Sequence, residues 1–307
     1  MAGVIEAAAA DPQPEAPVEA WRSWIRDLIR GACFSARRWS WVCARDRYFL
    51  KIPRVAGQLQ PDLSASRAEA EGEYRLTQQL TGQLDGMVEA PLRLIDACIV
   101  KRRLQGPDLW RLAQRVGGTP EVQAALAQGL VLAARLHRLD PATVPDLPVH
   151  DYAQDPSLPA PKELHDRLRR RPRTIVVGGL EVRNFMQDVN DGQWKFFDPH
   201  ETVLGAPEDD VARYILSLLM IDWGRHARCR IWTRFNYQHL LQAYEAARGT
   251  SLDQQLLAYM FQRNVARRRN EARDSTRDLP WFMHMAARAY EGLFFRQVRE
   301  WGSRHDL

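Results

Sequence analysis

The first hundred residues combine short β-prone runs with two stretches of helical periodicity. Residues 1–19 are rich in Ala, Pro and Glu and are expected to form a disordered tail, and apolar residues then recur at helical spacing over 21–29. Runs of aromatic and aliphatic residues next predict five strands, at 32–34, 39–44, 48–52, 87–88 and 92–100. A helix is predicted over 66–80. Residues 20–103 are therefore expected to form a small lobe with a five-stranded sheet and one helix.

From Pro107 onward the apolar positions follow a 3.6-residue period, which predicts a mostly helical lobe over residues 104–307. The predicted helices are 109–116, 120–139, 208–223, 232–248, 252–269 and 281–301. The two patterns together predict an α+β fold of two lobes.

One β-rich stretch, residues 174–212, interrupts the helical pattern. An apolar run at 175–177 leads to a pair of glycines, and Asn184 then precedes a short strand, an Asn-Asp-Gly turn at 190–192 and a second strand that ends at Asp198. An amide and a carboxylate at the ends of such a hairpin are the oxygen ligands that Mg²⁺ prefers. We therefore predict a metal-binding hairpin near 184–198, facing nucleotide phosphates.

The small lobe carries a matching basic candidate. Lys51 lies at the end of a predicted strand, and Glu73 lies in the helix that follows. A lysine held by such a glutamate can meet the phosphates of a nucleotide. Surface pairs of this kind are common, so the order of the parts along the chain is the stronger signal.

That order resembles the protein-kinase-like fold, in the branch of aminoglycoside phosphotransferases, choline kinases and lipopolysaccharide kinases. The resemblance covers about residues 28–300. The residues that carry it are Asn184-Phe185-Met186, Phe196-Phe197-Asp198-Pro199 and Gly205-Ala206-Pro207-Glu208-Asp209-Asp210-Val211-Ala212. It implies Mg-ATP-dependent phosphoryl transfer to a hydroxyl of a small molecule, sugar or glycolipid.

The resemblance also implies a role for individual residues. Asn184 and Asp198 would ligate Mg²⁺, and Asp210 would brace the catalytic loop. Lys51 would contact the phosphates, with Glu73 holding it. The strand 99–103, with Ile99 and Lys101, would lie against the adenine and contact it through its backbone.

The chain departs from the family pattern at the catalytic base. Family members carry an Asp five residues before the Asn, but that position here is Gly179, in the triplet Val177-Gly178-Gly179. Three explanations remain open: a substitute base, catalysis by positioning and electrostatics alone, or a pseudokinase that binds nucleotide without turnover. The first candidate for a substitute base is Glu181, followed by Asp188 and Glu201.

The segment 31–35 has one glycine where a phosphate-covering loop has two or three, so Ser35, Arg37 and Arg38 are the remaining candidates for phosphate contacts there.

Charge adds one further expectation. The net charge is +5, with arginine runs at 169–173 and 267–269, and these runs indicate either solvated faces or an anionic partner. The aromatic and basic segment 281–301 is expected to pack as a helix, with contact to an anionic membrane surface as the alternative. No nucleic-acid recognition motif is present, so nucleic acid is an unlikely partner.

The remaining features of the sequence are its cysteines, its histidines and the lack of targeting segments. The four scattered cysteines, with no signal peptide and no long apolar run, predict a cytoplasmic protein, in peripheral contact with the inner face of the membrane if a membrane is involved at all. The pair His150-Asp151 is expected to make a loop contact, and His200 and His226 with Cys229 are poor metal candidates.

Overall fold

A computed structural model describes residues 10–304, apart from 38, 56, 145, 153–157, 160, 200, 227–233 and 277–279. The chain divides into two compact units between Gln105 and Gly106.

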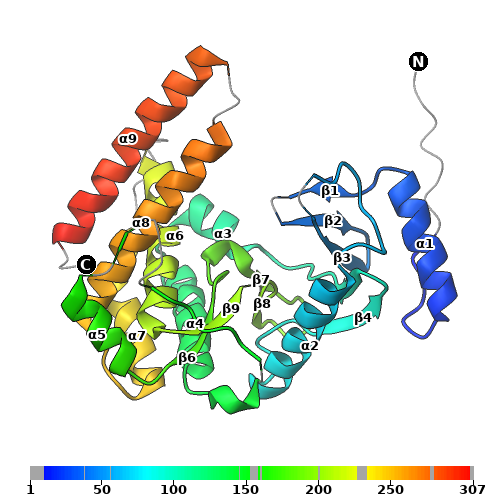
Figure 1. The fold of residues 1–307 in the computed structure, drawn as a ribbon, viewed down its shortest axis with the longest axis horizontal. Helices are drawn as coiled ribbons and strands as arrows, with labels where there is room; N and C mark the ends of the chain where they lie inside the picture. The colour runs from blue at the N-terminus through cyan, green and yellow to red at the C-terminus, as the bar shows by residue number, and fades with distance from the viewer. Residues whose placement is uncertain are drawn as a thin grey trace. The chain divides into compact units, whose positions relative to one another are not determined.

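The first unit is built on an antiparallel sheet whose five strands lie in the order β1-β2-β3-β5-β4 (Figure 1). The strands are β1 (Ser35–Ala36), β2 (Ser40–Ala44), β3 (Tyr48–Pro53), β4 (Pro91–Ile95) and β5 (Cys98–Arg102). Two helices, α1 (Val18–Arg30) and α2 (Arg67–Gln83), pack on the sheet.

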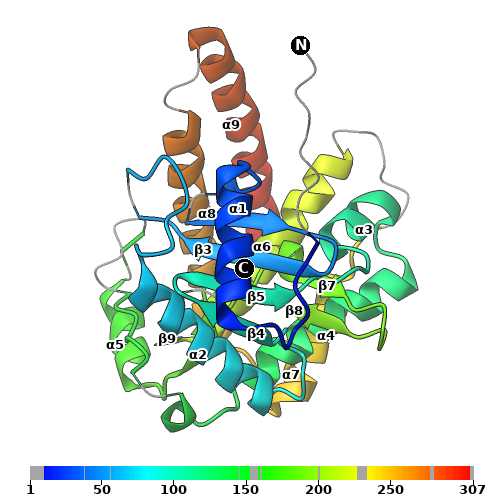
Figure 2. The ribbon, with the colours of Figure 1, turned by 90° about the vertical axis from the view of Figure 1, so that its right-hand side faces the viewer.

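The apolar stripe of α1 forms much of the core of this unit. Trp21, Trp24, Ile25 and Leu28 are buried, and the Trp21 ring lies 4.9 Å from the ring of Tyr48 on β3. Figure 2 shows α1 in front of the sheet. Burying aromatic rings of this size against strands contributes strongly to the stability of a small unit.

Two local expectations change in this unit. Residues 11–13, inside the predicted disordered tail, accept hydrogen bonds from the Arg47 backbone and side chain and from the Tyr48 hydroxyl, so they are held on the β2–β3 turn. The run 92–100, predicted as one strand, is the hairpin of β4 and β5. Asp96, at φ 53°, turns the chain there, and residues 87–88 lie outside the named strands.

The second unit is mostly helical. Its helices are α3 (Leu109–Val116), α4 (Pro120–Leu136), α5 (Lys162–Arg170), α6 (Pro207–His226), α7 (Tyr237–Arg248), α8 (Gln254–Thr276) and α9 (Trp281–Arg304), with short 3₁₀ turns at Pro141–Thr143 and Val182–Asn184. The helix α4 packs on α7 and α6 packs on α8. In Figure 1, α8 (orange) and α9 (red) lie side by side.

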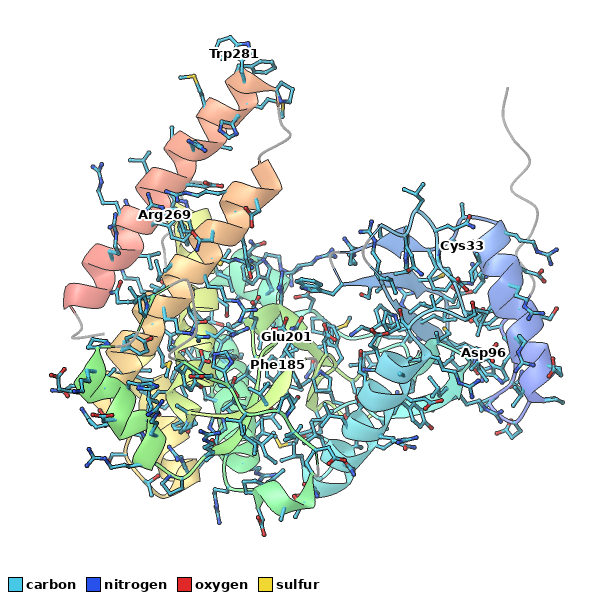
Figure 3. All side chains as sticks on the ribbon, viewed as in Figure 1. Cys33, Asp96, Phe185, Glu201, Arg269 and Trp281 are labelled. Atoms are coloured by element: carbon cyan, nitrogen blue, oxygen red, sulfur yellow. The ribbon has the colours of Figure 1, made fainter. Side chains whose placement is uncertain are left out.

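Two small antiparallel pairs lie among these helices. Strands β6 (Thr174–Val177) and β9 (Thr202–Gly205) pair with each other, and β7 (Phe185–Gln187) pairs with β8 (Trp194–Phe196). The hairpin predicted near 184–198 is thus the β7–β8 pair. Phe185 anchors it, because its ring packs 5.3 Å from Phe196 and 6.0 Å from Tyr214 of α6 (Figure 3).

None of the described helices has an apolar window long enough to cross a membrane.

Candidate functional site

In the first unit, Lys51 and Glu73 form the ion pair that the sequence predicted. The Lys51 Nζ lies 2.9 Å from Glu73 Oε1, and both side chains are about nine-tenths buried. Lys51 is fixed by β3, whose backbone pairs with Val42 on one side and Ile99 on the other. The pair therefore presents a restrained ammonium group rather than a mobile surface lysine.

Ile99 and Lys101 lie in the middle of the same sheet. Both are buried, and β5 pairs with β3 on one side and with β4 on the other. Their backbone groups are therefore committed to the sheet. Backbone contacts to a base are therefore expected after β5, from the Arg103 carbonyl onward, because the Arg103 N–H already donates to the Arg47 carbonyl at 2.9 Å.

In the second unit, Asn184 is buried and its side chain is oriented by one strong contact. Its Nδ2 donates to the Gly179 carbonyl at 2.6 Å. Separately, the backbone carbonyl of Asn184 accepts a hydrogen bond from the Phe197 N–H at 3.2 Å. Because the amide NH₂ faces Gly179, the Oδ1 atom is the part of the amide directed elsewhere. An oxygen held in this way suits a hard cation.

Asp198 follows β8 by two residues and is half-buried. The next residue, Pro199, accepts a hydrogen bond from the Thr202 hydroxyl at 2.9 Å, which fixes the turn into β9. Asn184 precedes β7 and Asp198 follows β8, and Phe185 lies opposite Phe196 in the pair, so both residues stand at the open end of the β7–β8 hairpin, away from its turn. Among the described residues no group of three or more His, Cys, Asp or Glu side chains could hold a metal alone.

Asp210, in the first turn of α6, joins β6 to the helical core. Its Oδ2 accepts from the Val177 N–H at 2.8 Å and lies 3.0 Å from His137 Nε2. The His137 Nδ1 in turn lies 2.7 Å from the Tyr244 hydroxyl. Burial raises the pKa of the Asp210 carboxyl, and the contacts with His137 and Val177 offset only part of that rise.

Two neighbouring carboxylates, which the sequence did not single out, are equally engaged. Glu208 is fully buried and lies 2.7 Å from Arg171 Nη1. Asp209 meets Arg263 at 3.0 Å and Asn264 at 2.8 Å. Burial alone would raise the pKa of the Asp209 carboxyl, but Arg263, Arg213 and Asn264 together hold it below its ordinary value. Three consecutive acids at a helix start were the available signal.

The loop after β6, at Gly178 and Gly179, is packed against Glu201. A Cβ atom on Gly178 would lie 2.6 Å from Glu201 Cβ and 2.7 Å from its Oε2, so only glycine fits there. Glu201, labelled in Figure 3, has φ 54° and its Oε2 lies 3.2 Å from Arg267 Nη2. Arg213 also donates to the Gly178 carbonyl. A carboxylate therefore lies beside this loop, and it comes from the residue before β9.

The other two candidate bases have different surroundings. Asp188 is buried in the hairpin turn, where it accepts from Asn190 and pairs with Lys195 at 3.0 Å, so it is a structural residue. Glu181 pairs with Arg183 at 2.7 Å and lines a cavity of about 30 Å³. A cavity of that size has room for water rather than for an acceptor molecule.

The remaining candidates fall outside the site or outside the described residues. His150 Nε2 lies 2.7 Å from Arg263 Nη2, which is a loop contact as expected. Arg37 donates its N–H to Ser40 in the β1–β2 turn and Ser35 is exposed. Arg38, His200 and Cys229 lie outside the described residues, as does the His226 side chain.

Comparison with solved structures identifies the fold. A Ralstonia eutropha protein, assigned but not demonstrated as an aminoglycoside phosphotransferase, matches at 16% identity and a TM-score of 0.60, over 94% of this chain and 98% of that chain. Spectinomycin phosphotransferase with ADP and spectinomycin matches at 11% identity and a TM-score of 0.54, over 89% of this chain and 93% of that one.

A third match is an aminoglycoside phosphotransferase from Streptomyces rimosus with ADP and streptomycin. It is 17% identical with a TM-score of 0.51, over 81% of this chain and 97% of that one. No protein-family sequence model and no curated protein sequence matches the chain. The chain thus has the protein-kinase-like fold of the aminoglycoside phosphotransferases, a two-lobed α+β fold.

Proposed function

We propose that this protein is a Mg-ATP-dependent phosphotransferase that acts on a hydroxyl group of a small molecule, sugar or glycolipid. The observation that carries the proposal is the Asn184 amide, locked onto the Gly179 carbonyl at one end of the hairpin that ends at Asp198. This arrangement occurs in a chain with the fold of small-molecule phosphotransferases.

Each unit supplies part of the proposed chemistry. Asn184 and Asp198 would hold Mg²⁺, which neutralises charge on the transferred phosphoryl group. Lys51, restrained by Glu73, would bind phosphate oxygens. The backbone after β5, from Arg103 onward, would contact the base. Asp210 would hold the loop through the Val177 N–H.

The proposed base is Glu201, ahead of Glu181. In the transfer, the acceptor oxygen forms its bond to the γ-phosphorus while the bond to ADP breaks, and the acceptor proton passes to the carboxylate. Glu201 Oε2 lies against Gly178, next to the position where the family carries its Asp, whereas Glu181 lines the 30 Å³ cavity.

A non-catalytic nucleotide-binding scaffold is the second candidate. The glycine at 179 favours it, because it stands at the position of the family's Asp and cannot take a proton. In that case Lys51, Asn184 and Asp198 would bind nucleotide as a signal rather than as a substrate.

Under either proposal we infer that any membrane contact is peripheral and is made by the exposed start of α9, at Trp281 (Figure 3) and Phe282.

Thermal unfolding with and without Mg-ATP tests nucleotide binding. A ligand at a hundred times its dissociation constant stabilises the folded state by about 2.7 kcal/mol. We expect this stabilisation in the wild type and in Asp191→Ala, a matched acidic residue in the hairpin turn, and its loss in Asp198→Ala and Lys51→Met. No stabilisation of the wild type at millimolar Mg-ATP would contradict both proposals.

Turnover then separates the two. Phosphoryl transfer to streptomycin and spectinomycin, together with ATP hydrolysis, gives the readout. We expect Glu201→Gln to lower kcat by about 100-fold or more and Glu181→Gln to have little effect. The reverse result would assign the base to Glu181. Nucleotide binding without any turnover would support the scaffold.

A further inference from the structure

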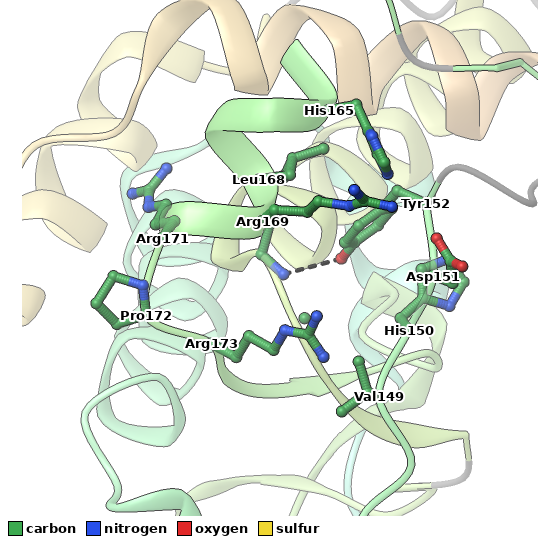
Figure 4. A pocket seen from close by; sticks show the side chains of 12 residues that line it. Val149, His150, Asp151, Tyr152, His165, Leu168, Arg169, Arg171, Pro172 and Arg173 are labelled. Atoms are coloured by element: carbon green, nitrogen blue, oxygen red, sulfur yellow. Dashed lines mark hydrogen bonds between the residues drawn. The ribbon is translucent and has the colours of Figure 1, made fainter. Parts of the chain in front are cut away.

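A cavity of about 220 Å³ lies in the second unit, away from the hairpin. Its walls come from the segment 149–152, the second half of α5, the approach to β6, and the end of β9 with Ala206. Figure 4 shows Arg169 and Arg173 extending into this space beside Tyr152 and His150, whereas Arg171 turns away from them.

The wall behind these arginines is rigid. Tyr152 is 6% exposed, and its hydroxyl accepts from the Ala206 N–H at 2.8 Å and donates to Asp209 at 3.5 Å. Gly205 has no room for a side chain, because a Cβ atom there would lie 2.6 Å from the Tyr152 hydroxyl. The cavity therefore has a fixed floor rather than a loop surface.

Positive charge in this cavity is only partly neutralised. Arg171 is paired with the buried Glu208. Within the described ranges, the side chains of Arg169 and Arg173 form no ion pair or hydrogen bond. The nearby acid in the lining, Asp151, already has an interaction of its own. Two guanidinium groups that share one space repel each other, and an anion between them removes that repulsion.

Size and chemistry restrict the ligand. The volume is several times the roughly 30 Å³ that one water occupies in the liquid, but it is below the range of about 300–1,000 Å³ of drug-sized pockets. The planar forks of arginine match phosphate and carboxylate oxygens in bidentate geometry. His150 and His165 add further nitrogen atoms at the rim.

This cavity is separate from the proposed nucleotide site in the second unit. In the β6–β9 pair, Val177 lies opposite Thr202 at the catalytic-loop end, and Thr174 lies opposite Gly205 at the cavity end. Three residues of strand separate the ends by about 10 Å. The first turn of α6 connects the two places, since Asp209 reaches Tyr152 and Asp210 reaches Val177.

We propose that this cavity is a binding site for a small anion carrying a phosphate or carboxylate group, held between Arg169 and Arg173. The proposal does not depend on phosphotransferase activity. It gives the arginine run at 169–173 a role in binding an anion, with Arg171 structural and Arg169 and Arg173 contacting the ligand.

Calorimetric titration of the full chain without Mg²⁺ tests the proposal, at constant ionic strength set with chloride. Inorganic phosphate is one probe and succinate is the other. The variant is Arg169→Gln/Arg173→Gln, and the control is Arg170→Gln, an exposed arginine at the same helix end that does not line the cavity. The melting temperatures of the unliganded variants check folding, and we expect them to be close to that of the wild type because both side chains are exposed.

We expect the wild type and Arg170→Gln to bind at least one probe, with affinity reduced about tenfold or more in the double variant. Preference for phosphate or for succinate assigns the anionic group. Equal affinity in the wild type and the double variant, or no binding of either probe at millimolar concentration, would overturn the proposal.

Discussion

The contact between Gly178 and Glu201 determines which residue can follow β6. The two residues meet because β6 and β9 pair in register, which brings the end of one strand beside the beginning of the other. The Gly178 N–H donates to the Glu201 carbonyl at 3.2 Å, and the glutamate side chain occupies the space that a Cβ would need. Glycine at 178 is therefore a packing requirement, independent of any loss of activity.

Substituting Gly178 by alanine should destabilise the protein by about 1–3 kcal/mol, because the added methyl overlaps Glu201. Urea unfolding measures the change. Gly72→Ala, in α2 with no heavy atom within 4 Å of the new methyl, is the control and should be stabilising by about 0.5–1 kcal/mol. Adding Glu201→Gly should recover most of the loss, since glycine removes the overlapping side chain and tolerates φ 54°. Equal effects at 178 and 72 would contradict this packing.

Substitution of Gly179 by aspartate tests the proposed role of Glu201 as the base. Gly179 is not among the described residues with positive φ, so an aspartate can take its backbone conformation without left-handed strain. In a Glu201→Gln background, Gly179→Asp should restore phosphoryl transfer by about 100-fold or more. Gly179→Asn is the isosteric control that cannot accept the proton. Equal rescue by Asn and Asp would show that the substitution acts by positioning alone.

At the scale of elements, the first turn of α6 organises the second unit. Its three consecutive acids reach three different partners: Glu208 reaches Arg171 beside α5, Asp209 reaches α8, and Asp210 reaches α4 and β6. Carboxylates are favourable at a helix N-terminus, but these are buried and depend on their partners. One turn of helix thereby connects β6 and the loop that follows it to the helical core.

Arg263→Met should therefore destabilise the protein by about 3–5 kcal/mol at neutral pH, because it leaves Asp209 buried without its cation. In the wild type the pKa of Asp209 lies below its ordinary value of 3.8, so the pairing contributes fully above about pH 4 and is lost as pH falls through the folded-state value.

In the variant, burial is opposed less, so the pKa of Asp209 should rise and the carboxyl should take up a proton at higher pH. The difference in unfolding free energy between wild type and variant should thus shrink as the pH is lowered from 7 toward about 4. Arg269→Met, an exposed position on the same helix, should change stability by no more than about 0.5 kcal/mol. A pH-independent difference would exclude Asp209 as the cause.

The helices show which elements a pattern can predict. The range 109–116 matches α3 because Asp108 caps its start and Gly117 follows its end. The helix α5 has Leu168 as its one buried residue, so it offers no apolar stripe to detect. The hairpin of β4 and β5 is predicted from the sequence as one strand for a similar reason. Its turn has Asp96 in a left-handed conformation, and there is no glycine to mark the turn in the sequence.

At the scale of the molecule, the two units carry different parts of the proposed function. The first holds the Lys51–Glu73 pair, and the second holds Asn184, Asp198 and the arginine-lined cavity. The net charge of +5 is a property of the whole chain. The helix α9 of the second unit begins with an exposed apolar segment. Trp281 is 76% exposed and Met285 is 63% exposed.

Contact with an anionic surface makes a prediction at this scale. The protein should co-sediment with vesicles that contain phosphatidylserine at low salt and should dissociate at high salt, because screening weakens the attraction. Trp281→Ser should weaken this binding. Trp39→Ser, at an exposed tryptophan in the first unit, should not. Equal loss in both variants, or none in either, would exclude the start of α9 as the contact.

The sequence by itself determined the two-part organisation, most helices and the motif from Asn184 to Asp210, because periodicity and capping are local and the motif residues are close along the chain. Only the tertiary structure decided which carboxylate lies beside the loop after β6. Glu201 reaches Gly178 through strand pairing, and Asp188 is occupied by its own turn. The arginine run was visible in the sequence. Its division into a partner for the buried Glu208 and two arginines that line a cavity depended on the direction that each side chain takes at and after the end of α5.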